Sequence, residues 1–256
     1  MSLLEKHKKS YIMYSRTQVF KNKKKRTQNL ILKALNENKK PYIAVSTGKD
    51  SMSMLGLIYE LGIIDIMFHD SRVELPESYN IISKINKNFN TVKIIKSPVD
   101  VLEVYKKKNA FEIGACEDIA FTEAMMQPIE SWIKENNYDL AFIGLRKQES
   151  SRRRKMLCHY GSYFYSKTHK INQCFPLADW KGEDIWAYLL THPILKNMIH
   201  PAYYKDKLVD DPAKIRISWY CDPTMSTKGH FLWLKHYYPH LFENLLKSNP
   251  EIISFV

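Results

Sequence analysis

The stretch Pro41-Tyr42-Ile43-Ala44-Val45-Ser46-Thr47-Gly48-Lys49-Asp50-Ser51 decides how this sequence is interpreted. It begins as a short apolar run, which is typical of a buried β-strand, and it ends as a polar turn. A helical apolar pattern follows from Met52. A strand, a glycine turn and a helix in this order aim backbone N–H groups and the helix dipole at a bound anion, so we expect a phosphate site here.

The turn from Ser46 to Ser51 combines hydroxyls, a glycine, an ammonium group and a carboxylate. This set suits a polyphosphate such as ATP with Mg²⁺, and Asp50 is the expected metal ligand because carboxylate oxygen is a hard donor. The turn is not a Walker A loop, which needs a glycine where Ile43 stands and a Ser or Thr directly after the lysine. The alternative is an ordinary helix N-cap beside a lysine.

The composition indicates one sizeable α/β domain with appendages, since 256 residues with 45% hydrophobic content can bury a substantial core. No apolar run is long enough to span a bilayer and the first residues lack a secretory apolar segment, so we expect a cytoplasmic protein without a membrane partner. The four cysteines are isolated and form no C-x-x-C pair. We therefore expect free thiols and no iron–sulfur cluster.

The net charge of +12 is concentrated near the start of the chain. Residues 1–40 hold twelve Lys and Arg side chains against two Glu, and Tyr11, Tyr14 and Phe20 are interleaved with them. Such a segment suits a nucleic-acid backbone, so we expect nucleic-acid contact through residues 1–26. The alternatives are a solubilising or disordered extension, or a subunit contact, and a homodimer is compatible with the latter.

Between residues 41 and 144 short apolar runs alternate with helical patterns, which predicts βαβ units and a parallel sheet. Ligands of such sheets bind beyond the carboxyl ends of the strands. The Ser46–Ser51 turn, Asp70 with Ser71, and Gly144–Arg154 all fall at that edge. We expect strands at 41–46, 63–68, 92–95 and 140–144, and helices at 3–16, 27–38, 50–61, 76–88, 100–107, 117–136, 227–236 and 240–247.

Four stretches resemble known motifs. The Ser-x-Gly-Lys-Asp-Ser turn resembles the PP-loop of the ATP pyrophosphatases, which cleave ATP between its α and β phosphates. Three further stretches are similar to motifs of the phosphoadenosine phosphosulfate (PAPS) reductase family, a PP-loop branch. They are Phe68-His69-Asp70-Ser71-Arg72-Val73-Glu74-Leu75-Pro76-Glu77-Ser78-Tyr79, Gly144-Leu145-Arg146-Lys147-Gln148-Glu149-Ser150-Ser151-Arg152-Arg153 and Phe175-Pro176-Leu177-Ala178-Asp179-Trp180-Lys181-Gly182-Glu183-Asp184-Ile185-Trp186-Ala187-Tyr188.

The resemblance covers residues 41–190 and implies the α/β fold of the adenine nucleotide α-hydrolases, with a Rossmann-like, five-stranded, mostly parallel sheet. We accordingly expect a basic helical extension at 1–40, a PP-loop nucleotide-binding domain at 41–190, and a helical C-terminal region at 191–256 packed on the core.

The resemblance also implies roles for individual residues. Attack at the α phosphorus is catalysed mainly by positioning and by cations, so Lys49, Asp50, Arg146 and Arg152 are the expected catalytic residues. Cys116, at a predicted helix N-terminus, is a candidate persulfide carrier, with a small buried core residue as the alternative. The residues expected to bind the nucleotide are Ser46, Thr47, Gly48, Lys49, Ser51, Asp70, Ser71, Gly144 and Arg153.

Two departures from the family bear on function. PAPS reductases carry a cysteine in a C-terminal Glu-Cys-Gly tail and adenylyl-sulfate reductases carry tandem cysteine pairs, whereas this sequence has neither. PAPS reductases also commonly lose the Lys-Asp of the loop, which is retained here as Lys49-Asp50. The missing cysteines argue against reductase chemistry by either route, and the retained Lys49-Asp50 favours ATP as the substrate.

We therefore expect an ATP pyrophosphatase that adenylates an acceptor for sulfur transfer. The favoured acceptor is a DNA backbone, as in DNA phosphorothioation systems, with a cysteine desulfurase as sulfur donor. One alternative is a sulfate-assimilation enzyme, similar to PAPS reductase or to the small subunit of sulfate adenylyltransferase. Another is a regulatory module that binds the nucleotide without turnover.

Overall fold

The computed structural model describes residues 2–107, 122–205, 217 and 230–256. Its centre is a six-stranded sheet in the order β3-β2-β1-β4-β6-β5. The strands are β1 (Pro41–Ala44), β2 (Asp65–Asp70), β3 (Val92–Lys96), β4 (Leu140–Phe142), β5 (Tyr163–Ser166) and β6 (Ile171–Cys174). All neighbouring pairs are parallel except β5 with β6. The expected α/β fold with a mostly parallel sheet is confirmed.

The sheet has six strands where five were expected. Neither β5 nor β6 is among the strand ranges predicted from the sequence, and β5 pairs antiparallel with β6 at the edge of the sheet. The two strands are joined by a turn in which Lys170 has a φ of 52°. The sequence of this hairpin mixes polar and aromatic residues, so it lacks the continuous apolar run that identifies the central parallel strands.

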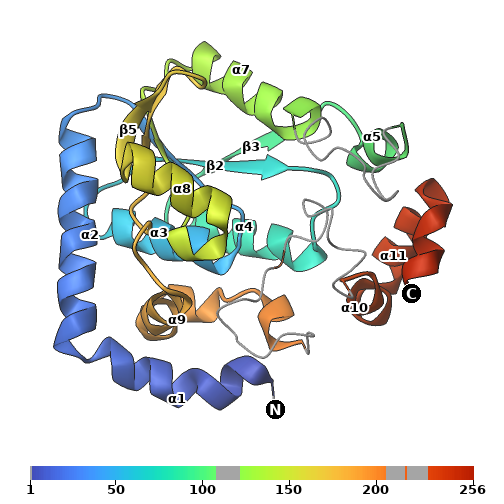
Figure 1. The fold of residues 1–256 in the computed structure, drawn as a ribbon, viewed down its shortest axis with the longest axis horizontal. Coiled ribbons are helices and arrows are strands. Elements are labelled where there is room, and N and C mark those ends of the chain that lie inside the picture. The colour runs from blue at the N-terminus through green and yellow to red at the C-terminus, as the bar shows by residue number, and fades with distance from the viewer. Residues whose placement is uncertain (1, 108–121, 206–216, 218–229) are drawn as a thin grey trace.

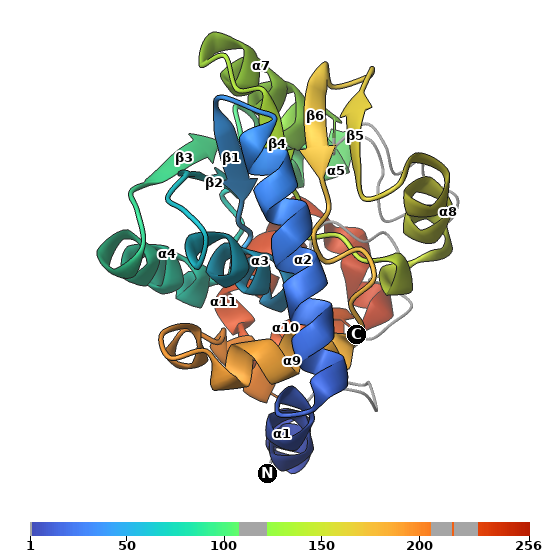
Figure 2. The ribbon, with the colours of Figure 1, turned by 90° about the vertical axis from the view of Figure 1, so that its left-hand side faces the viewer.

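Helices lie on both faces of the sheet (Figures 1 and 2). They are α1 (Leu3–Ser15), α2 (Gln18–Asn36), α3 (Lys49–Tyr59), α4 (Pro76–Asn88), α5 (Val101–Lys107), α7 (Gln127–Glu135), α8 (Ser151–Tyr160), α9 (Gly182–Thr191), α10 (His230–Tyr237) and α11 (Pro239–Ser248). Alternate residues of β1 face opposite layers, since Ile43 belongs to the main core and Tyr42 packs with Ile133 of α7. No helix in the described part of the chain is both long and apolar enough to cross a bilayer.

Several predicted boundaries agree with the structure and others do not. The helix predicted from Pro76 to residue 88 is α4, because proline favours the first position of a helix. The helix predicted at 27–38 begins earlier, at Gln18, where the Thr17 hydroxyl caps it by accepting from the Phe20 N–H. Residues 151–154, for which no helix was predicted, form the first turn of α8, which is capped by Ser150.

The basic N-terminal segment packs against the rest of the molecule. The Tyr14 hydroxyl donates to one oxygen of Asp184 at 2.8 Å, and Lys23 Nζ lies 2.7 Å from the other. Asp184 is fully buried at the start of α9. The aromatic side chains of Tyr11 and Phe20 are also buried, and Phe20 packs edge-on against Trp180. These aromatic rings are therefore committed to internal packing, and buried side chains of α1 and α2 belong to the main hydrophobic core.

Candidate nucleotide-binding site

The Ser46–Ser51 turn joins β1 to α3 at the carboxyl edge of the sheet, as the sequence predicted. The Ser51 Oγ accepts from the Ser46 N–H at 3.1 Å and donates to the Gly48 carbonyl at 3.0 Å. The hydroxyl oxygens of Ser46 and Ser51 lie 3.2 Å apart. The two hydroxyls expected to contact a phosphate are thus brought together at the start of α3, with Gly48 as the N-cap of the helix.

The side chain of Thr47 points away from this pair of hydroxyls. Its hydroxyl donates to Ser78 Oγ at 3.0 Å, and Ser78 Oγ lies 3.3 Å from Nε2 of the buried His200. Thr47 has a φ of 57°, a conformation that is costly for a β-branched residue and is held only where the surroundings fix it. The Thr47 side chain therefore anchors the turn to α4.

Lys49, Asp50 and Arg146 form the electrostatic centre of the site. One Asp50 oxygen lies 3.0 Å from Lys49 Nζ, and the other accepts from Arg146 Nε. Lys49 and Arg146 are each only 3% exposed. Burial by itself raises the pKa of Asp50, but the charges and hydrogen bonds of the two cations outweigh burial and hold this pKa below its ordinary value. Two cations thus share one carboxylate at the N-terminus of a helix.

Arg146 is held in place by its own segment. Its backbone N–H donates to Glu149 Oε2 at 2.8 Å, and its Nη1 donates to Gln148 Oε1 at 3.1 Å. Gln148 Oε1 also accepts from the Gly182 N–H at 2.9 Å, which fixes the position of that amide. The Nη2 of Arg146 makes no hydrogen bond within the described residues, so its two N–H groups can be donated to a ligand.

Gly144 lies between the end of β4 and the first turn of α3. A methyl group at this position would lie 3.2 Å from both the Cα and the backbone N of Ser51. Only glycine allows the two segments to approach this closely without a shift of backbone. Gly144, expected as a nucleotide-binding residue, therefore has an identifiable structural role next to the turn.

Tyr203 is a site residue that the sequence analysis did not identify. It lies in the 3₁₀ turn η4 (Pro201–Tyr204), is 2% exposed, and its hydroxyl accepts from the Lys49 N–H at 2.8 Å. Trp186 packs edge-on against its ring at 5.0 Å. Burial raises the pKa of Tyr203 far above its ordinary value, so the hydroxyl stays protonated. No sequence motif contains this residue, because it is far from Lys49 in the sequence and contacts it only in the folded chain.

Asp70 and Ser71 follow β2 at the same edge of the sheet, and both are buried. One oxygen of Asp70 accepts from the Arg72 N–H and from the Tyr79 hydroxyl, each at 2.8 Å. The Ser71 hydroxyl donates to Glu74 Oε1 at 2.8 Å. These contacts are those of a self-supporting turn, and the expected role of the two residues beside the adenosine stays a prediction.

The other predicted residues lie on α8 or outside the described residues. Arg153 pairs with Glu149 at 2.7 Å, whereas Arg152 is exposed on α8 and has no ion pair within the described chain. Cys116 lies outside the described residues. Of the described cysteines, Cys158 is exposed on α8 and Cys174 is buried, where desolvation raises the pKa of its thiol.

A metal held by protein side chains alone has no support in the described ranges, where no group of three or more His, Cys, Asp or Glu is placed to bind one. A Mg²⁺ ion at a nucleotide commonly needs only one or two carboxylates, because phosphates and water complete its shell. Asp50 fits that role only if a ligand draws Lys49 or Arg146 toward its own phosphates, since both oxygens of Asp50 are engaged.

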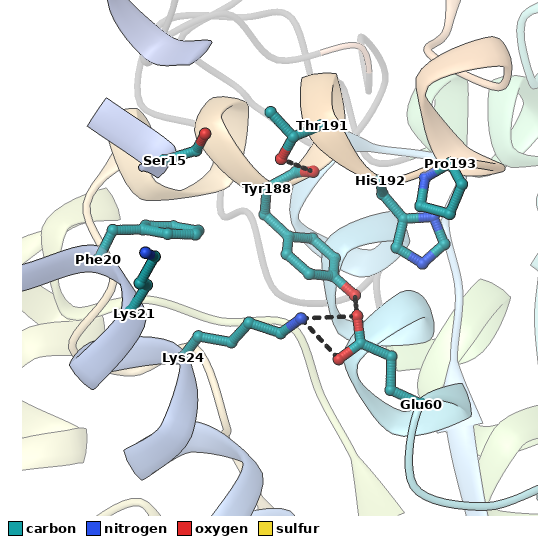
Figure 3. Close-up of a pocket in the computed structure, with 9 residues that line it drawn as sticks. All are labelled: Ser15, Phe20, Lys21, Lys24, Glu60, Tyr188, Thr191, His192 and Pro193. Carbon is teal, nitrogen blue, oxygen red and sulfur yellow. Dashed lines mark hydrogen bonds and ion pairs between the residues drawn. The ribbon is translucent and has the colours of Figure 1, made fainter. Parts of the chain in front are cut away.

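A pocket in the described part of the chain lies elsewhere, between the N-terminal helices and α9 (Figure 3). Its volume is about 270 Å³, and none of the predicted nucleotide-binding residues lines it. Glu60 lines this pocket, and its carboxylate accepts hydrogen bonds from Lys24, Gln28 and the Tyr188 hydroxyl at 2.8–2.9 Å. The pocket lies where α2 packs against α9 and the end of α3, and it is not the candidate site.

Comparison with known proteins supports the family resemblance. A profile of the phosphoadenosine phosphosulfate reductase domain matches residues 40–206. The chain is 25% identical to an adenosine 5'-phosphosulfate reductase of Bacillus cytotoxicus over 166 residues, which are 63% of this chain and 68% of the relative. It is 27% identical to the enzyme of that name from Bacillus mycoides over 177 residues, 67% of this chain and 72% of the relative.

The fold is shared with a solved structure of phosphoadenylyl-sulfate (PAPS) reductase from Candida auris in complex with phosphate. The match has a TM-score of 0.52 at 19% identity and covers 66% of this chain and 80% of the other. At this identity the match shows a common fold and carries no further conclusion about ligands.

Proposed function

The chain belongs to the phosphoadenosine phosphosulfate reductase family, and we propose that the Ser46–Ser51 turn binds the phosphate or sulfate end of an adenosine nucleotide. The observation that carries this proposal is the sharing of Asp50 by the buried cations Lys49 and Arg146. Within the described residues, the ion pairs of both cations are made with this one carboxylate, at a helix N-terminus that itself favours anions. A bound phosphate or sulfate would share Lys49 and Arg146 with Asp50. It would also accept a hydrogen bond from Arg146 Nη2.

The favoured substrate class is an adenosine phosphosulfate, in keeping with the names of the relatives. In the proposed reaction a thiol takes the sulfonate group from the nucleotide, the bond from sulfur to the bridging oxygen breaks, and AMP leaves. A second thiol then releases sulfite and closes a disulfide, so two thiols of a dithiol reductant are oxidised. Lys49 and Arg146 would stabilise the charge that develops on the departing AMP phosphate.

The test is a calorimetric titration of the purified protein with adenosine 5'-phosphosulfate, its 3'-phosphorylated form, ATP and AMP. The proposal predicts that a phosphosulfate binds more tightly than AMP, because AMP lacks the second anionic group. It also predicts release of sulfite and AMP in the presence of a dithiol. Equal affinity for all four nucleotides would contradict the assigned role of the turn. Binding without sulfite release would contradict the proposed reductive step.

A second candidate, cleavage of MgATP between the α and β phosphates, is favoured by the retained pair Lys49 and Asp50. An oxygen of a nucleic-acid phosphate would attack the α phosphorus, and pyrophosphate would leave. A sulfur nucleophile, supplied by a donor such as a cysteine desulfurase, would then displace AMP. Lys49 would neutralise the departing pyrophosphate, and Mg²⁺, if bound at Asp50, would add further charge stabilisation.

The two candidates are separated by pyrophosphate release from MgATP, measured with and without an oligonucleotide. ATP cleavage predicts release by the wild-type protein and none by Asp50→Ala, with a thermal melt to confirm that the variant is folded. Sulfite formation from the phosphosulfate together with no pyrophosphate from MgATP would favour the first candidate and reject the second.

A further inference from the structure

The exposed face of α8 concentrates positive charge beside the candidate site. The sequence of α8 is Ser-Arg-Arg-Arg-Lys-Met-Leu-Cys-His-Tyr, with four Lys or Arg side chains and no carboxylate. Arg152, Arg154 and Lys155 are exposed, and none of them has an ion pair within the part of the chain that the structure describes. Unpaired cations on one short helix attract a polyanion, because no internal partner competes for them.

The carboxylates near α8 in the described residues are already paired with other cations. Glu149 precedes α8 and is paired with Arg153 at 2.7 Å. Asp179 is exposed and is paired with Lys147 at 2.7 Å. Counting the described residues alone, Arg152, Arg154 and Lys155 stay without an ion pair after these pairs have formed.

The end of α8 adds an aromatic platform. Tyr160 is 58% exposed and stacks on Phe164 of β5, with ring centroids 5.1 Å apart and an angle of 29° between the planes. Phe164 stacks in turn on the buried Phe175, at 5.6 Å and 19°. Tyr160 is therefore the outermost of three stacked rings, and the innermost ring, that of Phe175, is buried in the core. A ring held in this way is suited to stacking against a nucleic-acid base.

The N-terminal segment lacks this combination. Its aromatic residues Tyr11 and Phe20 are buried, and Lys23 and Lys24 are engaged by Asp184 and Glu60. Lys25 and Arg26 of α2 remain exposed. The rings of Tyr11 and Phe20 cannot stack on a base beside them, because both rings are buried. Charge and stacking coincide at α8.

We propose that the α8 surface, defined as Arg152, Arg154, Lys155 and Tyr160, binds single-stranded nucleic acid. The positive side chains would contact the phosphodiester backbone, and Tyr160 would stack on a base. From Arg152 to Tyr160 the helix rises about 12 Å, which is long enough to contact more than one phosphate of a strand. Because α8 follows Arg146 after only a short turn, a strand bound there lies next to the nucleotide site.

The test measures the fluorescence anisotropy of a labelled twelve-nucleotide oligo-dT as full-length protein is added at several salt concentrations. The double variant Arg154→Gln with Lys155→Gln is compared with Lys25→Gln with Arg26→Gln, which removes the same charge from α2. The proposal predicts that the α8 double variant binds at least tenfold more weakly. It also predicts that the slope of log affinity against log salt becomes shallower by about 1.4, since each phosphate contact contributes about 0.7. The α2 double variant should retain both the affinity and the slope.

Tyr160→Ala provides a second readout that charge alone cannot produce. It is expected to weaken binding by fivefold or more with an unchanged salt slope, because stacking is lost while the phosphate contacts remain. Equal losses for the α8 and α2 double variants would overturn the proposal in favour of diffuse attraction. Tighter binding of heparin than of oligo-dT, with no effect of Tyr160→Ala, would overturn it in favour of a general polyanion surface. The proposal does not depend on the nucleotide chemistry, because oligo-dT binding is measured without ATP or a phosphosulfate.

Discussion

The carboxylate of Asp50, at the start of α3, is hydrogen-bonded by the guanidinium of Arg146, which lies 96 residues later beyond β4. Lys49 occupies the other oxygen of the same carboxylate at 3.0 Å. The contact joins the two motifs that flank β1 and β4, which are neighbours in the sheet. One acid thereby holds two buried cations at the start of α3, and this is the arrangement on which the proposed nucleotide site depends.

Removing the Tyr203 hydroxyl should destabilise the turn. In Tyr203→Phe the buried Lys49 N–H loses its acceptor at 2.8 Å, so we expect the free energy of unfolding to fall by about 1–3 kcal/mol. Urea denaturation measures this change. Tyr204→Phe is the matched control, because Tyr204 is the neighbouring and more exposed tyrosine. A loss in the control as large as that in Tyr203→Phe would contradict the assigned contact.

Gly144→Ala should disturb the nucleotide site more than it disturbs the fold. The added methyl group would lie 3.2 Å from the backbone of Ser51, so the turn must move by a few tenths of an ångström. We expect adenosine nucleotide affinity to fall about tenfold, in line with the sensitivity of such sites to small displacements. Gly62→Ala is the control, since a methyl group there meets no atom within 4 Å. Unchanged affinity in Gly144→Ala would show that the close approach of β4 does not matter for binding.

The N-terminal helices should be required for stability. Asp184→Ala removes the buried partner of the Tyr14 hydroxyl and of Lys23, and we expect a loss of about 3 kcal/mol. Glu183→Ala, which alters the exposed neighbour on the same turn of α9, should change stability by less than about 0.5 kcal/mol. If Asp184→Ala melts at the wild-type temperature, the packing of α1 and α2 on α9 is not a stabilising contact.

Mild acid should destabilise the fold through His69. Burial lowers the pKa of His69 below the 6.5 of an exposed histidine, although its contact with the Ala124 carbonyl and the charge of Asp70 act in the opposite direction. The unfolded chain therefore binds more protons than the folded one below pH 6.5, and stability falls as the pH drops through this range. Thermal melts from pH 7.5 to 5.5 should show this fall, and His69→Gln should reduce it. An equally steep fall in the variant would assign the effect to other groups.

Much of the fold could be predicted from local sequence. The βαβ alternation and the start of α4 at Pro76 follow from residue patterns that act over a few positions. The turn at Ser46–Ser51 and the segment at Arg146 were identified because their motifs are local as well. The meeting of Asp50 with Arg146 was expected only at the level of a shared sheet edge.

Contacts between segments that are far apart in the sequence could not be predicted. The basic composition of residues 1–40 suggested a helical extension that contacts nucleic acid, but it did not indicate that Tyr11 and Phe20 pack inward or that Lys23 pairs with the buried Asp184. Tyr203 carries no motif, since it reaches Lys49 from 154 residues away. The hairpin of β5 and β6 was missed because an edge hairpin needs no continuous apolar run.

The most direct test of the nucleotide site is calorimetric titration of the favoured phosphosulfate into Arg146→Ala, Arg146→Lys and Arg154→Ala. We predict that Arg146→Ala weakens binding at least tenfold, because a buried charge-assisted hydrogen bond to the ligand is lost. Arg146→Lys should fall between that variant and the wild type, since it keeps the charge but loses the forked donor geometry. Arg154→Ala, which removes an exposed arginine of α8, should change the affinity less than twofold. Wild-type affinity in a folded Arg146→Ala protein, or equal losses in Arg146→Ala and Arg154→Ala, would contradict the assignment of the site.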